Sequence, residues 1–388
     1  MLKHPKVLQP MSDESDTPSD GEQDSRNHAS RRDTLKAAGA FSFLGVEAFL
    51  TKSEDTVEIP IVVRDGEALD TTRVPRSWYE HILNVRRIRS NLHNRYYEQS
   101  WYDYVAQAAA DARIKELHKH QVKVYVSDLS AARDALPNQI EDIPISVEKS
   151  REKYIDDHLG SDTCDEETST YSCVPGGAYL RDNASGGHTC WTSTCIVESS
   201  GSYYLMTSAH PYGNCGDNIS NEPTYSGKYS PKKIGEVRSY NHDYDVAIID
   251  QSGSINGIDN TIVGEPYDVR GAVSESYCDT LISNYDTIHH MGISTGRTSG
   301  YLDEKVQATA PHCNRTSVDF LKPSTDAGGG DSGGPHYWIN SNYNYIAILG
   351  PHSYHTMMSG NHFRSFCPAG YAIEDSLNWN FGASSSTC

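Results

Sequence analysis

The first 163 residues of this 388-residue chain contain no cysteine, and all nine cysteines lie beyond them. Disulfides form and persist in oxidising environments. The asymmetry therefore predicts a C-terminal part built for such an environment, joined to an N-terminal part that is not. Because the count is odd, at least one thiol is expected to be free or to pair between chains. The cysteines are Cys164, Cys173, Cys190, Cys195, Cys215, Cys278, Cys313, Cys367 and Cys388.

Positive charge is also scarce, and no two cysteines have the Cys-x-x-Cys spacing of a metal site. Lysine and arginine together number 33 against 52 aspartate and glutamate residues, so the formal net charge is -19. Such a surface repels phosphate backbones, which argues against a nucleic-acid partner. It favours adaptation to high salt, where an acidic surface stays hydrated and its self-repulsion is screened. An ordinary acidic protein is the alternative.

Long hydrophobic runs are missing as well. The apolar run at residues 37–50 is too short for a comfortable membrane span and contains Glu47. It follows "SRRDTLK" at residues 30–36, which resembles the S-R-R-x-x-L-K pattern of a twin-arginine export signal. We therefore expect a secreted or cell-surface protein with no membrane span in its mature form, and the alternative is a basic cap on an amphipathic helix. The polar, acidic residues 1–29 are predicted to form a disordered tail.

Residues 51–165 are predicted to form an α+β unit. A stripe of apolar residues has the spacing of one helix face, and "VKVYVSDLSAARDALPNQIEDIPISVE" indicates a strand, a helix closed by Pro137, and a second strand. His118 and His120 are interpreted as a solvated helix end. We interpret this unit as a pro-region or chaperone-like domain, with a permanent binding domain as the alternative. The stripe consists of Trp78, Ile82, Val85, Ile88 and Leu92.

The composition changes near Cys173. Glycine, serine, threonine and tyrosine become frequent, and short apolar runs such as "YYLMTSA", "DVAIID" and "YNYIAILG" are separated by turn residues. This pattern is typical of a fold of short antiparallel strands. The segment "AIEDSLNWNFG" at residues 372–382 predicts a closing helix.

Three short strings carry the residue types of a Ser-His-Asp triad. "YLMTSAH" ends an apolar run in His210, "YDVAIID" opens one with Asp245, and "DAGGGDSGGP" is centred on Ser332. Such catalysis needs a hydroxyl, a base within hydrogen-bond reach, and a carboxylate that fixes the tautomer of the base. The chain order histidine, aspartate, serine is that of the chymotrypsin fold. Asp243 would point to the opposite face of a strand and is the poorer candidate.

Residues 174–382 resemble the trypsin and chymotrypsin family of serine proteases, and look closest to the secreted bacterial branch of the streptogrisin and α-lytic type. The resemblance implies a mainly β, chymotrypsin-like double antiparallel β-barrel with a C-terminal helix, formed by residues 174–388. It implies that Ser332 is the nucleophile, His210 the general base and Asp245 its orienting carboxylate. Beyond the triad strings, the similar segments are "MGISTGRTSG" at 291–300, "AILGPHSY" at 347–354 and "FCPAGYAIEDSLNWNFG" at 366–382.

The glycines before Ser332 have a chemical explanation. Without a Cβ they adopt positive φ, so the N–H groups of Gly330 and Ser332 are expected to converge into an oxyanion hole. The resemblance implies that Asp331 holds this loop by pairing with a positive group. That group is a freed N-terminal amine in the animal enzymes, but Pro175 departs from the usual start, so an internal arginine is the alternative.

The cysteines depart from the family pattern. Pro211 follows the base where relatives have cysteine, and Cys215 is expected to bridge back to Cys190 or Cys195. Gly328 stands where relatives have a second cysteine. The other pairs that we consider are Cys278 with Cys313 and Cys164 with Cys173.

The two candidate residues of the specificity pocket indicate opposite substrate preferences. Asp326 matches the position of a trypsin-like pocket carboxylate, which would pair with an arginine or lysine side chain. His352 resembles a histidine of glutamate-specific relatives, where it receives an acidic side chain. We lean to basic substrates. Ser353 and Tyr354 are expected to present their backbone to an extended peptide by strand addition.

The sequence thus predicts an exported serine endopeptidase, made as a precursor, whose partner is a protein or peptide substrate. No organic cofactor or metal is implied, and the oligomeric state stays open. A catalytically silent protein used for surface binding and an esterase with the same triad are the alternatives, since acyl transfer is the shared chemistry.

Overall fold

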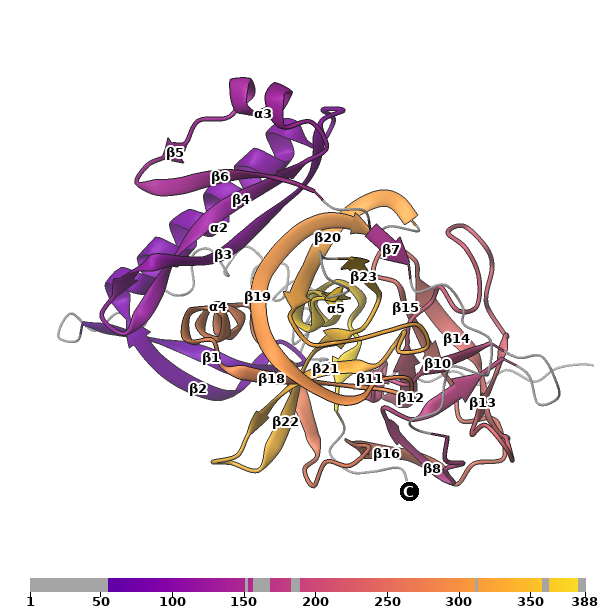
Figure 1. Cartoon of the computed structure of the whole chain (residues 1–388). Helices are drawn as coiled ribbons and strands as arrows, with labels where there is room; N and C mark the ends of the chain where they lie inside the picture. The colour runs from indigo at the N-terminus through magenta and orange to yellow at the C-terminus, as the bar shows by residue number, and fades with distance from the viewer. Residues whose placement is uncertain are drawn as a thin grey trace, which may run out of the picture. The chain divides into compact units, whose positions relative to one another are not determined.

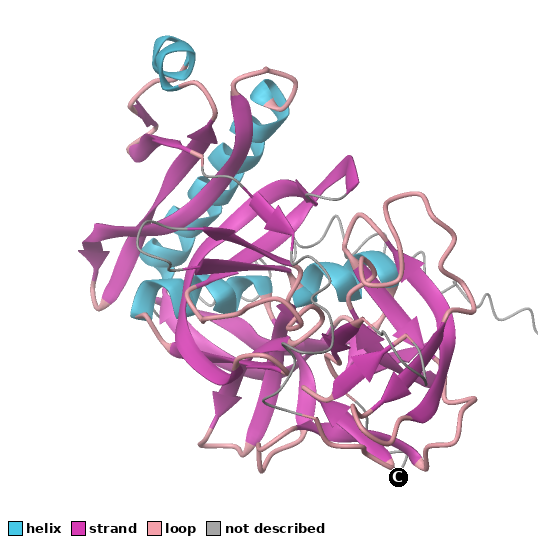
Figure 2. Ribbon diagram, turned by 45° about the vertical axis from the view of Figure 1, so that its right-hand side comes forward, coloured by secondary structure: helices cyan, strands magenta, loops and turns pink. Residues whose placement is uncertain are grey.

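The computed structural model describes residues 55–150, 153–155, 168–182, 189–310, 313–357 and 363–382 (Figure 1). The predicted tail at 1–29 and export segment at 30–50 lie outside these residues. No helix in the described ranges is long and apolar enough to cross a membrane. Strands make up most of the described chain (Figure 2), so the predicted mainly β fold is confirmed.

The N-terminal elements form a hairpin followed by a helix that packs on a sheet (Figure 1). All five residues of the predicted helical stripe are buried on α2, and three of them join valines of β4 in one hydrophobic cluster. The elements are β1 (Thr56–Arg64), β2 (Glu67–Pro75), α2 (Arg76–Tyr96), β3 (Tyr102–Ile114), β4 (Leu117–Val126), α3 (Leu129–Ala135), β5 (Gln139–Ile140), β6 (Ile143–Lys149) and β7 (Lys153–Ile155).

The predicted strand–helix–strand order is confirmed by β4, α3 and β6, and α3 ends before Pro137. Asp128 begins α3, because its carboxylate accepts from the N–H groups of Ser130 and Ala131. The interpretation of His118 and His120 as a solvated helix end is wrong, because both lie on β4 and His120 is fully buried. Alternate side chains of a strand face the same side, which places His120 with the buried valines of β4.

Eight of the described strands form the first sheet, in the order β10-β9-β13-β14-β15-β12-β11-β25. Its interior is lined by aliphatic side chains and Trp191. The short parallel pair of β8 (Cys173–Gly176) and β16 (Gly257–Ile262) stands beside it. The strands of the first sheet are β9 (Tyr179–Arg181), β10 (Cys190–Thr192), β11 (Ile196–Ser199), β12 (Ser202–Thr207), β13 (Pro223–Ser226), β14 (Lys232–Asn241), β15 (Val246–Ile249) and β25 (Asn380–Phe381).

Fifteen described strands form the second sheet, in which the long β19 curves around one side (Figure 1). The closing helix is confirmed as α5 (Gly370–Leu377). The helix α4 (Glu275–Asn284) has no counterpart in the sequence prediction; Ser274 begins it by accepting from the N–H of Tyr277. The remaining strands are β17 (Val269–Val273), β18 (Thr287–Gly292), β19 (Gly296–Ala310), β20 (Cys313–Pro323), β21 (Pro335–Asn340), β22 (Tyr345–Pro351), β23 (Tyr354–Met357) and β24 (Phe363–Pro368).

The N-terminal strands continue the second sheet. Strand β1 pairs with β17, β3 pairs with β19, and β7 pairs with β23. Ile61 and Val62 of β1 are buried in the same cluster as Leu281 of α4. The residues before and after the segment 156–167 therefore share both hydrogen-bonded ladders and a hydrophobic core.

Candidate active site

The first sheet brings His210 and Asp245 together. Strands β12 and β15 are antiparallel neighbours with Thr207 opposite Ala247. The end of β12 therefore lies beside the start of β15. His210 follows the end of β12, and Asp245 directly precedes the start of β15. Asp245 has a φ of 52°, an uncommon value for a residue other than glycine, and this turn aims its carboxylate at His210.

The three predicted triad side chains are buried and in contact. His210 Nδ1 lies 2.7 Å from Asp245 Oδ2, and His210 Nε2 lies 2.8 Å from Ser332 Oγ. Asp245 is fully buried, and its Oδ1 also accepts from the backbone N–H of His210 at 2.9 Å. With Nδ1–H donating to the carboxylate, Nε2 is left to accept the proton of the serine hydroxyl.

Ser353 takes part through its side chain as well as its backbone. Its Oγ donates to Asp245 Oδ2 at 2.5 Å, and its N–H donates to Phe366 O at 3.0 Å. From the sequence we expected only a backbone role for Ser353. A serine directly after a histidine on a predicted cleft strand was the available signal, but it does not indicate which carboxylate the hydroxyl would meet.

Of the three glycines directly before Asp331, Gly330 has the positive φ that was expected. Gly330 has a φ of 95° and its carbonyl accepts from Thr192 Oγ1 at 2.9 Å, which fixes the peptide plane. Within the described residues, the N–H groups of Gly330 and Ser332 donate to no protein acceptor. A Cβ at Gly333 would lie 2.2 Å from Thr207 Oγ1, so this position requires glycine.

Asp331 anchors this loop from behind. Its carboxylate accepts from the N–H groups of Ser294 (2.8 Å) and Gly328 (3.0 Å) and from Thr295 Oγ1 (2.7 Å). The side chain that faces this carboxylate is His290, whose Nε2 lies 3.6 Å from Asp331 Oδ2, where an arginine was the alternative expected from the sequence. Burial by itself would raise the pKa of Asp331, but the facing His290 and these donors hold that pKa below its ordinary value.

Three fully buried histidine rings pack together beside the loop. The rings of His290 and His336 are stacked with centroids 4.4 Å apart, and His352 lies 5.5 Å from each. His336 Nε2 is 3.3 Å from His352 Nδ1, and Thr325 Oγ1 is 3.2 Å from His336 Nδ1. Burial, together with the two neighbouring imidazoles, lowers the pKa of His336 well below its ordinary value, so its ring is neutral.

The other predicted pocket residue, Asp326, is exposed. It contributes its backbone carbonyl, which accepts from Thr298 Oγ1 at 2.8 Å. The side chain of Tyr354 is fully buried and stacks on Phe366 with ring centroids 4.6 Å apart. Only the Tyr354 backbone is thus left for pairing, and it pairs with Ile155 of β7 on the side opposite β24.

The cysteine pairs differ from the expectation. Cys215 is bonded to Cys313, so the predicted bridges from Cys215 to Cys190 or Cys195 and from Cys278 to Cys313 are wrong. Hydrophobic packing buries Cys195 and Cys278 as free thiols, as it does Cys367, which confirms that at least one thiol is free. The observed bond ties the loop after His210 to the start of β20. Cys173 is disulfide-bonded, and Cys164 lies outside the described residues.

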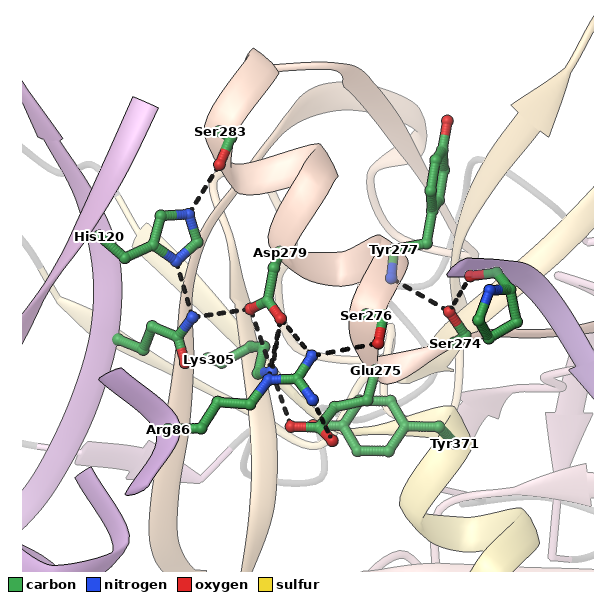
Figure 3. A network of polar contacts seen from close by, with 12 residues as sticks. Arg86, His120, Ser274, Glu275, Ser276, Tyr277, Asp279, Ser283, Lys305 and Tyr371 are labelled. Carbon is green, nitrogen blue, oxygen red and sulfur yellow. Dashed lines mark hydrogen bonds and ion pairs between the residues drawn. The ribbon is translucent and has the colours of Figure 1, made fainter. Parts of the chain in front are cut away.

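A second buried cluster joins N-terminal strands to α4 and contains the same three residue types as the triad (Figure 3). His120 Nε2 lies 2.8 Å from Ser283 Oγ, and Gln107 Nε2 bridges His120 Nδ1 (2.7 Å) to Asp279 Oδ1 (2.8 Å). Asp279 also pairs with Lys305 at 3.0 Å and with Arg86.

No protein-family model matches the chain, and no curated protein matches it. Similar solved structures are bacterial serine proteases that align with about half of the chain. A glutamic-acid-specific serine protease that uses a histidine triad in substrate binding has 19% identity and a TM-score of 0.38, over 54% of this chain and 100% of the other. Thermobifida fusca protease A has 15% identity and a TM-score of 0.38, over 54% and 100%.

Nocardiopsis protease has 16% identity and a TM-score of 0.37, and the alignment covers 54% of this chain and 99% of that protease. These likenesses concern the fold. The mainly β fold and the closing helix that the sequence predicted are confirmed; the described part of the first sheet is antiparallel, and the second sheet also contains the parallel pairs β17–β22 and β4–β6.

Proposed function

We propose that the chain is a serine endopeptidase that cleaves peptide bonds after acidic side chains. The observation that carries the proposal is the buried imidazole of His210, held at hydrogen-bond distance from both Asp245 and Ser332. This arrangement lets Ser332 attack a carbonyl while His210 takes its proton, and lets His210 return that proton to the leaving amine. The N–H groups of Gly330 and Ser332 would hold the oxyanion.

The choice of acidic substrates follows from the two pocket candidates. His352 is fully buried and hydrogen-bonded to His336, so an acidic side chain reaching it would meet an oriented imidazole in a low-dielectric setting. Asp326 is exposed. A solvent-exposed carboxylate attracts a cationic side chain only weakly, so Asp326 would contribute little to the binding of an arginine or lysine side chain. The geometry thus supports His352 over Asp326 and replaces our lean to basic substrates.

The pairing of β7 with β23 supports synthesis as a precursor. Lys153, Tyr154 and Ile155 run antiparallel to the strand that follows Ser353, where an extended substrate would add. The full chain would then be latent until the linker after β7 is cut. Export through the signal at residues 30–36 and adaptation to salt belong to the same proposal, since the acidic composition and the disulfide both suit an extracellular protein.

The test is labelling of the purified full chain by a fluorophosphonate, before and after incubation in low and molar salt. We expect a single adduct on Ser332, slow in the intact chain and faster once the linker is cut. Ser332→Ala is the control and should show no adduct. An incubated, folded protein whose Ser332 stays unlabelled would refute the protease assignment.

Specificity is tested with a peptide library on two variants, His352→Gln and Asp326→Asn. We expect the wild type to cleave after glutamate or aspartate, His352→Gln to lose that preference, and Asp326→Asn to keep it. Cleavage after arginine that disappears in Asp326→Asn would restore the trypsin-like alternative and leave the serine mechanism standing.

A further inference from the structure

The side chain of His290 has no use in the triad, and yet it is fully buried on β18. Neither of its ring nitrogens makes a hydrogen bond within the described residues. A buried imidazole without hydrogen bonds is unfavourable unless another interaction offsets the loss of water. The group that faces it is the carboxylate of Asp331, at 3.6 Å.

The backbone makes room for this pair on both sides. A Cβ at Gly334 would lie 2.8 Å from Cε1 of His290, and a Cβ at Gly292 would lie 2.1 Å from the carboxylate of Asp331. Real Cβ atoms do not come this close, so any other residue at either position would require the neighbouring atoms to shift. The loop that carries Ser332 is therefore built around a histidine–aspartate contact.

The same ring borders the proposed specificity pocket. It stacks on His336 and lies 5.5 Å from His352, centroid to centroid. On its own sheet, β21 places His336 beside it and β19 places the uncharged Thr298 opposite it. Asp331 is thus a charged group on one side of His290, and the proposed specificity pocket at His352 lies on another side.

We infer that His290 is a positioning residue that couples the charge of the bound substrate to the oxyanion loop. An acidic side chain at His352 adds a negative charge near His290 and stabilises its imidazolium. The imidazolium attracts the carboxylate of Asp331, and this attraction orders the loop that carries Gly330 and Ser332. An acidic substrate would then raise kcat as well as lower KM, because the oxyanion donors act in the transition state. This inference rests on the proposed function.

The test compares matched peptides that differ only in glutamate or glutamine at the cleavage position, with kcat and KM measured separately. In the wild type we expect both constants to favour glutamate. In His290→Gln the advantage in kcat should fall by about 10-fold or more, while the advantage in KM, set by His352, remains. The control is His289→Gln, because the neighbouring His289 is half-buried and contacts Ser299 at 2.8 Å instead of Asp331.

An unchanged kcat advantage in His290→Gln, or an equal loss of kcat on both peptides, would mean that the ring only fills space and would overturn the inference. If that variant does not fold, Asp331→Asn removes the other partner of the contact, and the kcat advantage for glutamate should fall in the same way. A kcat advantage that persists in Asp331→Asn would also overturn the inference. A wild type that lacks turnover, or lacks any preference for glutamate, contradicts the proposed function instead.

Discussion

Two buried clusters in this chain contain a histidine, an aspartate and a serine, and only one has the connectivity of a catalytic triad. In the first, the carboxylate of Asp245 touches His210 directly, at 2.7 Å. In the second, Gln107 separates Asp279 from His120, and the carboxylate pairs with Lys305 and Arg86 instead (Figure 3).

The difference decides which nitrogen carries the proton. His210 donates from Nδ1 to its carboxylate, so its Nε2 accepts from Ser332. Ser283 donates its own proton to His118 O at 3.1 Å, so it must accept from Nε2–H of His120. Burial is the main reason that the pKa of His120 is lowered to about 3, and the nearby positive charges of Lys305 and Arg86 also lower it. The second cluster is thus a structural contact between the N-terminal strands and α4.

Removing the two serine hydroxyls should give the largest contrast. Ser332→Ala should lower kcat by about 10⁶-fold, because it removes the nucleophile. Ser283→Ala should keep the turnover of each folded molecule and lower stability only, since it leaves a buried N–H of His120 without an acceptor. Active-site titration with initial rates checks both. Comparable losses of turnover would mean that the two clusters are not functionally distinct.

The two carboxylates give a smaller but sharper contrast. Asp245→Asn should lower kcat by about 10⁴-fold with little change in stability, because the amide imposes the wrong tautomer on His210. Asp279→Asn should leave the buried charges of Lys305 and Arg86 with the partly exposed Glu275 as a partner, at 2.8 and 2.9 Å, and destabilise the fold by up to about 3–5 kcal/mol. Denaturant unfolding and kcat, measured on both variants, separate the effects. A purely kinetic defect in Asp279→Asn contradicts this division.

The disulfide distinguishes the surroundings of the two clusters. The Cys215–Cys313 bond lies in the loop after His210 and joins residues 98 positions apart in the sequence. Cys278, beside Asp279, is a free buried thiol. Replacing Cys215 and Cys313 by serine should lower stability by about 2–4 kcal/mol and reduce the effect of reductants on the thermal midpoint, which also depends on the disulfide-bonded Cys173 and Cys190. Cys278→Ala is the control and should stay sensitive to reductant. A double variant that melts with the wild type would show that the bond is dispensable.

The smallest change per experimental step is expected in the dependence of stability on pH. The pKa of His120 is depressed in the folded state to about 3, so between roughly pH 6.5 and that value the unfolded chain binds a proton that the folded chain does not. Stability is lost as pH falls through this window, by up to about 1.4 kcal/mol per pH unit from this group. His120→Gln should remove that part of the slope in urea unfolding at several pH values; an unchanged slope assigns the acid sensitivity elsewhere.

The local motifs were predictable because each depends on adjacent residues. The glycines before Ser332 and the apolar runs beside His210 and Asp245 identify their own turns and strands. The histidine cluster was not, since His290, His336 and His352 come from three separate segments and no short spacing announces that their rings meet.

Pairings between distant segments were equally out of reach. The start of β4, with His118 and His120, was interpreted as a helix end because the neighbouring lysine and glutamine are good helix formers, and pairing with β3 overrides that preference. Cys215 bonds to Cys313 because the fold brings the loop after His210 to the start of β20. Cysteine spacing in the sequence does not reveal this pairing. The Asp279 cluster likewise unites residues nearly two hundred positions apart, from Arg86 to Asp279.

The hairpin of β1 and β2 limits how far the chain can be shortened. Strand β1 pairs with β17, and the N–H of Ser274, which begins α4, donates to the carbonyl of Ile61. A recombinant form that starts at Cys173 would lose this strand, uncover Leu281 and leave the edge of β17 open to other molecules. We therefore expect expression of residues 173–388 alone to yield aggregates, and co-expression with residues 55–150 as a separate polypeptide to restore a soluble complex.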